Sequence, residues 1–323
     1  MSKNSHHEES FWRKYIFSTD HKTIGIQYGI TSLLFLFFGF SLMMVMRWQL
    51  AYPDTTVPFI GWLIKWLADL NGFASDGNLP SDMYNVFGAM HGTIMIFLGV
   101  VPLVVGAFGN YVVPLQIGAP DMAFPKLNMT SYWVYFVGGV IMLVSFFLPG
   151  GAANSGWTSY PPLSVIATTG QTFWILGMVF LITSSLLGSI NIIVTIIQLR
   201  APGLTWMRLP FFVWSQFVTS FLLVLAFPPL EAAAIFQLMD RVFGTSFFLP
   251  TGLVVGGEAF SFAFLASQIF LGHCKPAMYL VLDNVENFCA MINLHSGLLI
   301  LLYILPNHHR IFYAVDRFYP VFL

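Results

Sequence analysis

A histidine inside a long apolar stretch is the first residue of this chain with an obvious chemical use. His91 follows Asn85 by six residues, about two turns into the stretch, and glycines 88 and 92 flank it. Such glycines let a flat group or another helix approach closely. A neutral imidazole in this setting is a good axial ligand for haem iron. It could equally be hydrogen-bonded to a neighbouring helix.

A cation and two aromatic residues could complete such a site. Arg47 closes the first apolar stretch, and Trp157 and Tyr160 lie in the loop 156–163, which we expect on the same side of the molecule as His91. A cation, an imidazole and an aromatic pair at one depth suit an anionic macrocycle that carries propionates. Arg47 could instead reach for lipid headgroups, and the aromatic pair could belong to an interfacial belt.

A second set of polar residues gathers between residues 108 and 131. The amides of Asn110 and Asn128, the carboxylate of Asp121 and the hydroxyl of Ser131 lie near the ends of two apolar stretches. These groups could hold a chain of waters, with Asp121 collecting protons from bulk water. A turn rich in glycine and proline, with a solvated Asp121, would explain the same residues.

The composition places all these residues in a membrane protein. Of the 323 residues, 57% are hydrophobic and 8% are charged, whereas soluble globular chains carry about 25% charged residues. Two cysteines exclude a disulfide scaffold, and 34 Phe with 9 Trp exclude disorder. A net charge of −1 without a basic stripe argues against nucleic-acid binding. We therefore predict an all-α integral membrane helical bundle.

Seven stretches are apolar enough to cross a bilayer, which takes about 20 helical residues. They are residues 25–47, 84–109, 131–149, 171–198, 211–236, 259–282 and 288–305. The first five are the strongest, because His273 and Lys275 interrupt the sixth and the seventh is short. We expect an N-terminal tail over residues 1–22, a membrane domain over 23–257, and a divergent hydrophobic region with one or two helices over 258–323.

The basic residues predict the orientation of the bundle. Four of them precede the first span, namely Lys3, Arg13, Lys14 and Lys22. Residues 48–83, by contrast, carry four aspartates and one lysine. Lys and Arg concentrate in cytoplasmic loops, so we expect the N-terminus in the cytoplasm.

Several motifs, taken together, resemble subunit I of the haem–copper cytochrome c oxidases. They occur in order over about residues 11–257 as Asp20-His21-Lys22, Met46-Arg47, Asn85 to His91, Gly106-Ala-Phe-Gly-Asn110, Gly118-Ala-Pro-Asp-Met-Ala-Phe-Pro125, Gly156-Trp-Thr-Ser-Tyr-Pro-Pro-Leu163, Gly188-Ser-Ile-Asn191 and Pro210-Phe-Phe-Val-Trp-Ser215. The resemblance implies a twelve-helix bundle, of which about six or seven helices fall in this chain. It also implies a low-spin haem, a high-spin haem and a copper ion, which together reduce dioxygen to water while protons are translocated.

The resemblance assigns a role to each candidate residue. His91 resembles an axial ligand of the low-spin haem, and Arg47 resembles the arginine that contacts a substituent of that haem. Trp157 and Tyr160 lie in the loop that supports the haem propionates. Asp121 resembles the entrance of a proton pathway. The residues that resemble the polar lining of this pathway are Asn110, Asn128 and Ser131.

The resemblance weakens after about residue 257. In the family a histidine of the sixth helix binds copper and a catalytic tyrosine follows four residues later, whereas here His273 and Tyr279 are six apart and would leave a helix on different faces. His308 and His309 echo the family's paired copper ligands. Because the chain stops at Leu323, we expect it to lack the remaining ligands and to be unable to reduce oxygen alone. The sequence thus supports one haem at His91, and gives no support to the second haem or to copper.

The resemblance implies subunit I of a terminal respiratory oxidase in a bacterial inner membrane. Its partners would be subunit II, which holds the copper site that receives electrons, subunit III, and cytochrome c or a similar donor. Three alternatives stay open. These are subunit I of a quinol oxidase, a truncated or frame-disturbed membrane fragment without activity, and a transporter. A transporter predicts broken helices with internal symmetry, and the sequence shows neither.

Overall fold

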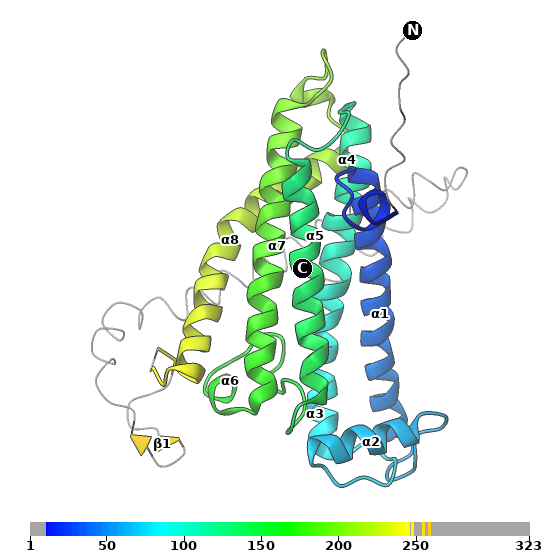
Figure 1. Ribbon diagram of the computed structural model, residues 1–323, viewed down its shortest axis with the longest axis vertical. Coiled ribbons are helices and arrows are strands. Elements are labelled where there is room, and N and C mark those ends of the chain that lie inside the picture. Colours follow the sequence, from blue (N-terminus) through cyan, green and yellow to red (C-terminus); the bar gives the residue numbers. More distant parts are fainter. Residues whose placement is uncertain (1–10, 246, 249–253, 256–257, 260–323) are drawn as a thin grey trace, which may run out of the picture.

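The computed structural model describes residues 11–245, 247–248, 254–255 and 258–259. Its helices are joined by loops, and its only strands among these residues are an antiparallel two-residue pair, β1 (Val254–Val255) and β2 (Glu258–Ala259). Five of its helical segments are long and apolar enough to cross a membrane, and they run side by side (Figure 1). They match the first five predicted spans, while the sixth and seventh, except for residue 259, lie outside the described residues.

Each span is longer than the apolar stretch that predicts it. The spans are α1 (His21–Ala51), the combined segment Ser81–Ile117, α5 (Pro125–Val144) with a 3-10 turn (Ser145–Phe147), α7 (Thr169–Gln198) and α8 (Phe211–Val242). The second span is built from α3 (Ser81–Thr93), two π-helical segments (Ile94–Val100 and Pro102–Gly109) and α4 (Asn110–Ile117). The shorter elements are a π-helical turn (Trp12–Ile16), α2 (Gly61–Asn71), α6 (Leu163–Ile166) and a 3-10 turn (Trp206–Arg208).

Prolines and glycines determine where several helices begin and end. Pro125 is the first residue of α5, and Pro80 and Pro210 directly precede α3 and α8. Proline suits these positions because the first N–H groups of a helix have no intrahelical acceptor. Gly72 and Gly118 end α2 and α4 with φ of 82° and 72°. That left-handed conformation is accessible to glycine at little cost.

The alternating spans sort the loops to two ends of the bundle (Figure 1). The turn Trp12–Ile16, the α4–α5 loop and residues 199–210 share one end, which we call the N-terminal end. Helix α2, helix α6 and the loop 148–168 share the other end, which we call the α2 end. Helix α7 packs along both α5 and α8, and α1 packs along the second span. The two groups of candidate site residues therefore lie towards opposite ends.

Helices α5 and α7 approach each other closely where two glycines face each other. A Cβ atom at Gly138 would lie 3.0 Å from the carbonyl oxygen of Gly177 and 3.0 Å from Cβ of Phe180. A Cβ atom at Gly177 would lie 2.6 Å from Cγ of Met142. Helices in lipid associate through such close packing, because lipid is as apolar as their side chains.

We predict that Gly138→Ala destabilises the bundle. Alanine gains about 1 kcal/mol of helix propensity over glycine, but overpacking a tight contact costs roughly 1–3 kcal/mol. The matched control is Gly29→Ala, whose Cβ would lie 3.6 Å from Cβ of Ala107, an ordinary contact. Thermal unfolding in detergent should show a lower midpoint for the first variant and an equal or higher one for the second. Equal shifts in both would contradict this account of the α5–α7 contact.

Candidate functional site

The imidazole of His91 is held in one orientation by a neighbouring helix. His91 lies near the end of α3, and its Nδ1 donates to the carbonyl oxygen of Gly39 in α1 at 2.8 Å. The side chain is half-buried. A proton on Nδ1 leaves the lone pair on Nε2, which is the tautomer that coordinates a metal through Nε2. The arrangement therefore combines both sequence interpretations, because the hydrogen bond to the next helix leaves the other ring nitrogen available as a ligand.

Trp157 packs directly against the helix that carries His91. A Cβ atom at Gly92 would lie 3.4 Å from Cδ1 of Trp157, and the rings of Trp157 and Phe97 are 6.3 Å apart. A Cβ atom at Gly88, on the same face of α3 as Gly92, would lie 3.2 Å from Cε of Met46. The two glycines thus allow both α1 and the loop 148–168 to come close to α3 beside His91.

Arg47 and Tyr160 are both more exposed than His91. Arg47 is exposed, and it follows Gly39, the contact of His91, by eight residues, or about 12 Å along α1. Tyr160 is half-exposed. The turn of α1 that contacts His91 thus lies deeper in the bundle than the turn that carries Arg47, and a shared group contacting both residues stays a prediction. The two residues share an end of the bundle, and a group touching both would have to extend along α1.

Buried amides fasten the loop that carries Trp157. Gln171 of α7 donates from Nε2 to Oγ of Ser159 at 3.0 Å, and Ser159 donates to Oε1 of Gln237 of α8 at 2.9 Å. Gln237 in turn donates from Nε2 to the carbonyl oxygen of Ser159 at 2.8 Å. All three side chains are buried. One serine of the loop is thereby bound to two transmembrane helices.

Arg241, one turn after Gln237, binds the rest of this loop. Its Nε donates to the hydroxyl of Thr172 at 2.8 Å. Its other nitrogens donate over 2.6–3.1 Å to four carbonyl oxygens, those of Ser164, Val165, Ala167 and Thr168. These carbonyls surround the end of α6 and the start of α7, where helices leave backbone groups without intrahelical partners. The sequence gives no sign of this contact, because 69 or more residues separate Arg241 from each acceptor.

At the N-terminal end, the loop that carries Asp121 is bound to α7. The hydroxyl of Thr195 accepts from the N–H of Ala123 at 2.9 Å. The amide of Asn191 accepts from the N–H of Phe124 at 2.9 Å and donates to its carbonyl oxygen at 3.3 Å. These bonds hold Asp121, which is half-buried, at the end of the bundle beside the start of α5.

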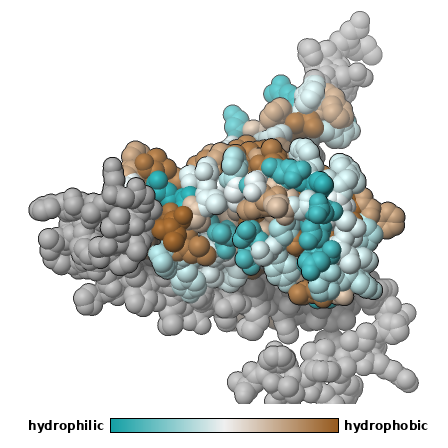
Figure 2. Space-filling view, turned by 90° about the horizontal axis from the view of Figure 1, so that it is seen from below, coloured by the Kyte–Doolittle hydropathy of each residue, from teal (hydrophilic) through white to brown (hydrophobic). Residues whose placement is uncertain are grey.

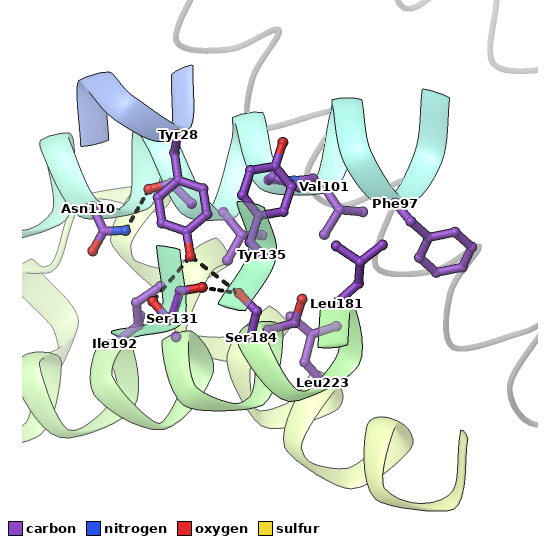
Figure 3. A pocket seen from close by; sticks show the side chains of 15 residues that line it. Tyr28, Phe97, Val101, Asn110, Ser131, Tyr135, Leu181, Ser184, Ile192 and Leu223 are labelled. Atoms are coloured by element: carbon purple, nitrogen blue, oxygen red, sulfur yellow. Dashed lines mark hydrogen bonds between the residues drawn. The ribbon is translucent and has the colours of Figure 1, made fainter. Parts of the chain in front are cut away.

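A small cavity lined by residues of all five spans lies close to the predicted polar residues (Figure 3). Its volume is about 30 Å³, which holds roughly two waters. Asn110 and Ser131 line it, as do Tyr28 and Ser184, two residues that no sequence pattern marks. The Tyr28 hydroxyl donates to Oγ of Ser131 at 3.1 Å, and Ser184 donates to the carbonyl oxygen of Ser131 at 2.6 Å. Asp121 and Asn128 do not line the cavity.

Two amides near this cavity have unused hydrogen-bonding atoms. Among the described residues, Oδ1 of Asn110 and both Oδ1 and Nδ2 of Asn128 are buried without a partner. Leaving such groups unpaired costs free energy, so buried amides normally contact protein or water. The backbone carbonyl oxygen of Asn110, in contrast to its side-chain Oδ1, has a partner, because Nδ1 of His21 donates to it at 2.9 Å. Asn110, Asn128 and Ser131 therefore supply polar atoms that waters can use.

The predicted copper residues cannot be placed in this arrangement. Tyr279, His273, His308 and His309 all lie outside the described residues. Within the described part, no group of three or more His, Cys, Asp or Glu side chains could hold a metal ion.

A comparison with protein families decides the membership of the chain. The model of the family "Cytochrome C and Quinol oxidase polypeptide I" matches residues 23–313. The chain belongs to this family. The match confirms the resemblance seen in the motifs and extends beyond residue 257, where those motifs end. Together with the five candidate spans, it makes the chain an integral membrane protein with an all-α helical bundle.

Individual relatives agree with the family model. The chain is 42% identical over 284 residues to cytochrome c oxidase subunit 1 of Thermostichus vulcanus, covering 87% of this chain and 46% of the relative. It is 39% identical over 280 residues to the subunit of the same name in a Synechocystis species, covering 86% and 45%. It is 38% identical over 288 residues to an alternative cytochrome c oxidase subunit 1 of Bradyrhizobium diazoefficiens, covering 85% and 45%. The chain thus spans about half the length of these relatives.

We predict that Arg241→Lys loosens the loop around α6. Lysine keeps the charge but lacks the planar fork that reaches several acceptors at once. A net loss of about 1.4 kcal/mol in local stability would raise amide exchange tenfold. Hydrogen exchange followed by mass spectrometry should show this increase within residues 159–168.

The control for this prediction is Arg208→Lys, an exposed position at the opposite end of the bundle. It should leave exchange in the loop unchanged. Unchanged exchange in the Arg241 variant would show that other contacts, such as those of Gln237, hold the loop without it.

Proposed function

We propose that this chain acts as part of subunit I of a terminal respiratory oxidase. In this proposal electrons pass through haem to dioxygen, which is reduced to water, and the reaction is coupled to proton translocation. The observation that carries the proposal is the His91 imidazole, fixed by the Gly39 carbonyl with Nε2 available, in a chain that matches the oxidase family from residue 23 to residue 313.

The residues around His91 suit a haem. The imidazole would supply an iron ligand of defined tautomer, and the glycines at positions 88 and 92 add no side chain to the helix surface beside it. Trp157 provides an aromatic surface beside Gly92, and the exposed Arg47 can balance anionic or polar substituents. A haem bound here would supply a reversible one-electron carrier.

The polar residues of the N-terminal end suit proton uptake. Asp121 exchanges protons with bulk water, and its loop is fixed to α7 through Thr195 and Asn191. The unpaired Oδ1 of Asn110, the unpaired amide atoms of Asn128 and the hydroxyl of Ser131 can hydrogen-bond waters that carry protons inwards. Tyr28 and Ser184 extend this polar path by one further step through their hydrogen bonds with Ser131.

The remaining cofactor residues and partners belong to the proposal as well. The family implies haem and copper, and we keep His273, His308 and His309 as candidate copper ligands with Tyr279 beside them. The partners would be subunits II and III and an electron donor, in a bacterial inner membrane with the N-terminal end of the bundle facing the cytoplasm. The donor is cytochrome c or, as the family description also covers, a quinol.

Replacing His91 tests whether it is the haem ligand. In the assembled oxidase, His91→Gly should abolish the low-spin haem signal in the visible spectrum, because the iron loses its axial imidazole. Adding free imidazole should restore part of the signal, since the glycine leaves room for it. A low-spin spectrum that is unchanged in the variant would show that His91 has only a structural role.

Replacing Asp121 tests the proposed proton uptake. Asp121→Asn removes the titrating group with little change of shape, so it should reduce proton translocation per electron several-fold while haem content stays constant. The control is Asp69→Asn, an exposed carboxylate of α2 at the other end. The number of protons translocated per electron can be measured for both variants in oxidase reconstituted into vesicles. A wild-type ratio in the Asp121 variant would refute the proposed role.

A further inference from the structure

Helix α2 lies across the end of the bundle rather than along it (Figure 1). It connects α1 to α3, the two elements that carry Arg47 and His91. The segment between α1 and α3 that contains α2 is bridged at its two ends by a hydrogen bond from the N–H of Leu79 to Oε1 of Gln49 at 3.1 Å. The position of α2 therefore affects where the ends of both helices lie.

The side chains of α2 fall into three stripes around the helix. At 100° per residue, one stripe packs on the protein and consists of buried Ile64, Ala68 and Asn71. A second stripe is apolar but exposed and consists of Trp62, Leu63, Trp66 and Leu70. We call it the lateral stripe. The third is polar and exposed and consists of Lys65 and Asp69.

The order of the three stripes around α2 matches contact with protein, with lipid and with water. The lateral stripe adjoins the buried stripe on one side and the polar stripe on the other. A helix at a membrane boundary meets protein, lipid and water in this order. A helix surrounded by water would not expose Trp62 to 72% and Trp66 to 50% on the same face. Tryptophan is enriched where lipid headgroups meet acyl chains.

A contact with the third span shows which way the lateral stripe faces. The ring of Trp66 lies 6.1 Å from the ring of Phe147, which ends the third span and is 50% exposed. The lateral stripe is thus continuous with the outer surface of a transmembrane segment. Figure 2 looks onto this end of the molecule, where a hydrophilic band crosses the face and hydrophobic side chains lie along parts of its edge.

We infer that α2 is an interfacial anchor whose lateral stripe inserts into the lipid leaflet at the α2 end. The occupant of this surface is the boundary between headgroups and acyl chains. Lys65 and Asp69 face water, and Lys65 pairs there with Asp76 at 3.6 Å. The anchor sets the depth at which the connection between α1 and α3 sits. This inference does not depend on the proposed oxidase function.

Nitroxide labels at single cysteines test the inference in the full chain, reconstituted into phosphatidylcholine vesicles. Cys274 and Cys289 are first replaced by Ser. Trp62→Cys places a label on the lateral stripe, and Asp69→Cys places a matched one on the polar stripe of the same helix. Power saturation with oxygen, which partitions into lipid, and with a water-soluble nickel chelate reports the surroundings of each label.

We expect the oxygen-to-nickel accessibility ratio to be several-fold higher at position 62 than at position 69. Equal ratios, or a higher ratio at position 69, would overturn the inference. A label at position 62 that neither reagent reaches would also overturn it, because it would show that a protein partner covers the stripe. An unchanged helix content by circular dichroism confirms that both labelled chains fold.

Discussion

The hydrogen bond from Nδ1 of His91 to the carbonyl oxygen of Gly39 connects the chemistry of this chain with its architecture. It requires α1 and the second span to pack closely, since a backbone carbonyl inside a helix can be reached only by a side chain that lies against that helix. The small residues of both spans permit this approach. A Cβ atom at Gly106 would come within 2.7 Å of the ring of Tyr28. The packing that fixes the imidazole thus also places Tyr28 beside the polar cavity.

The packed spans also supply hydrogen-bond partners for polar groups of the loops. Backbone groups that are buried away from water need a partner, and two loops of this chain find theirs in side chains of the spans. Arg241 and Gln237 of α8 satisfy the loop around α6, and Asn191 and Thr195 of α7 satisfy the loop that carries Asp121. The helices therefore position both candidate sites, one at each end of the bundle.

Much of this arrangement can be predicted from the sequence, because it depends on local patterns. Hydropathy gives the five spans, and the motif around His91 and the loop of Trp157 identify two parts that the structure brings together. Tyr28 and Ser184 are single hydroxyl residues in apolar runs, so no spacing marks them before the helices pack. Arg241 is equally hidden, because its acceptors lie far away in the chain. The depth of Arg47 depends on which turn of α1 meets His91, and the sequence does not specify this.

The central claim is that His91 offers Nε2 to a haem while Gly39 holds Nδ1. A density map of the haem-loaded, assembled oxidase at a resolution that separates side-chain atoms tests this most directly. We expect iron bonded to Nε2 of His91, with Nδ1 still within hydrogen-bonding distance of the Gly39 carbonyl. Iron bonded elsewhere, or a His91 ring turned away from Gly39 in the loaded protein, would contradict it.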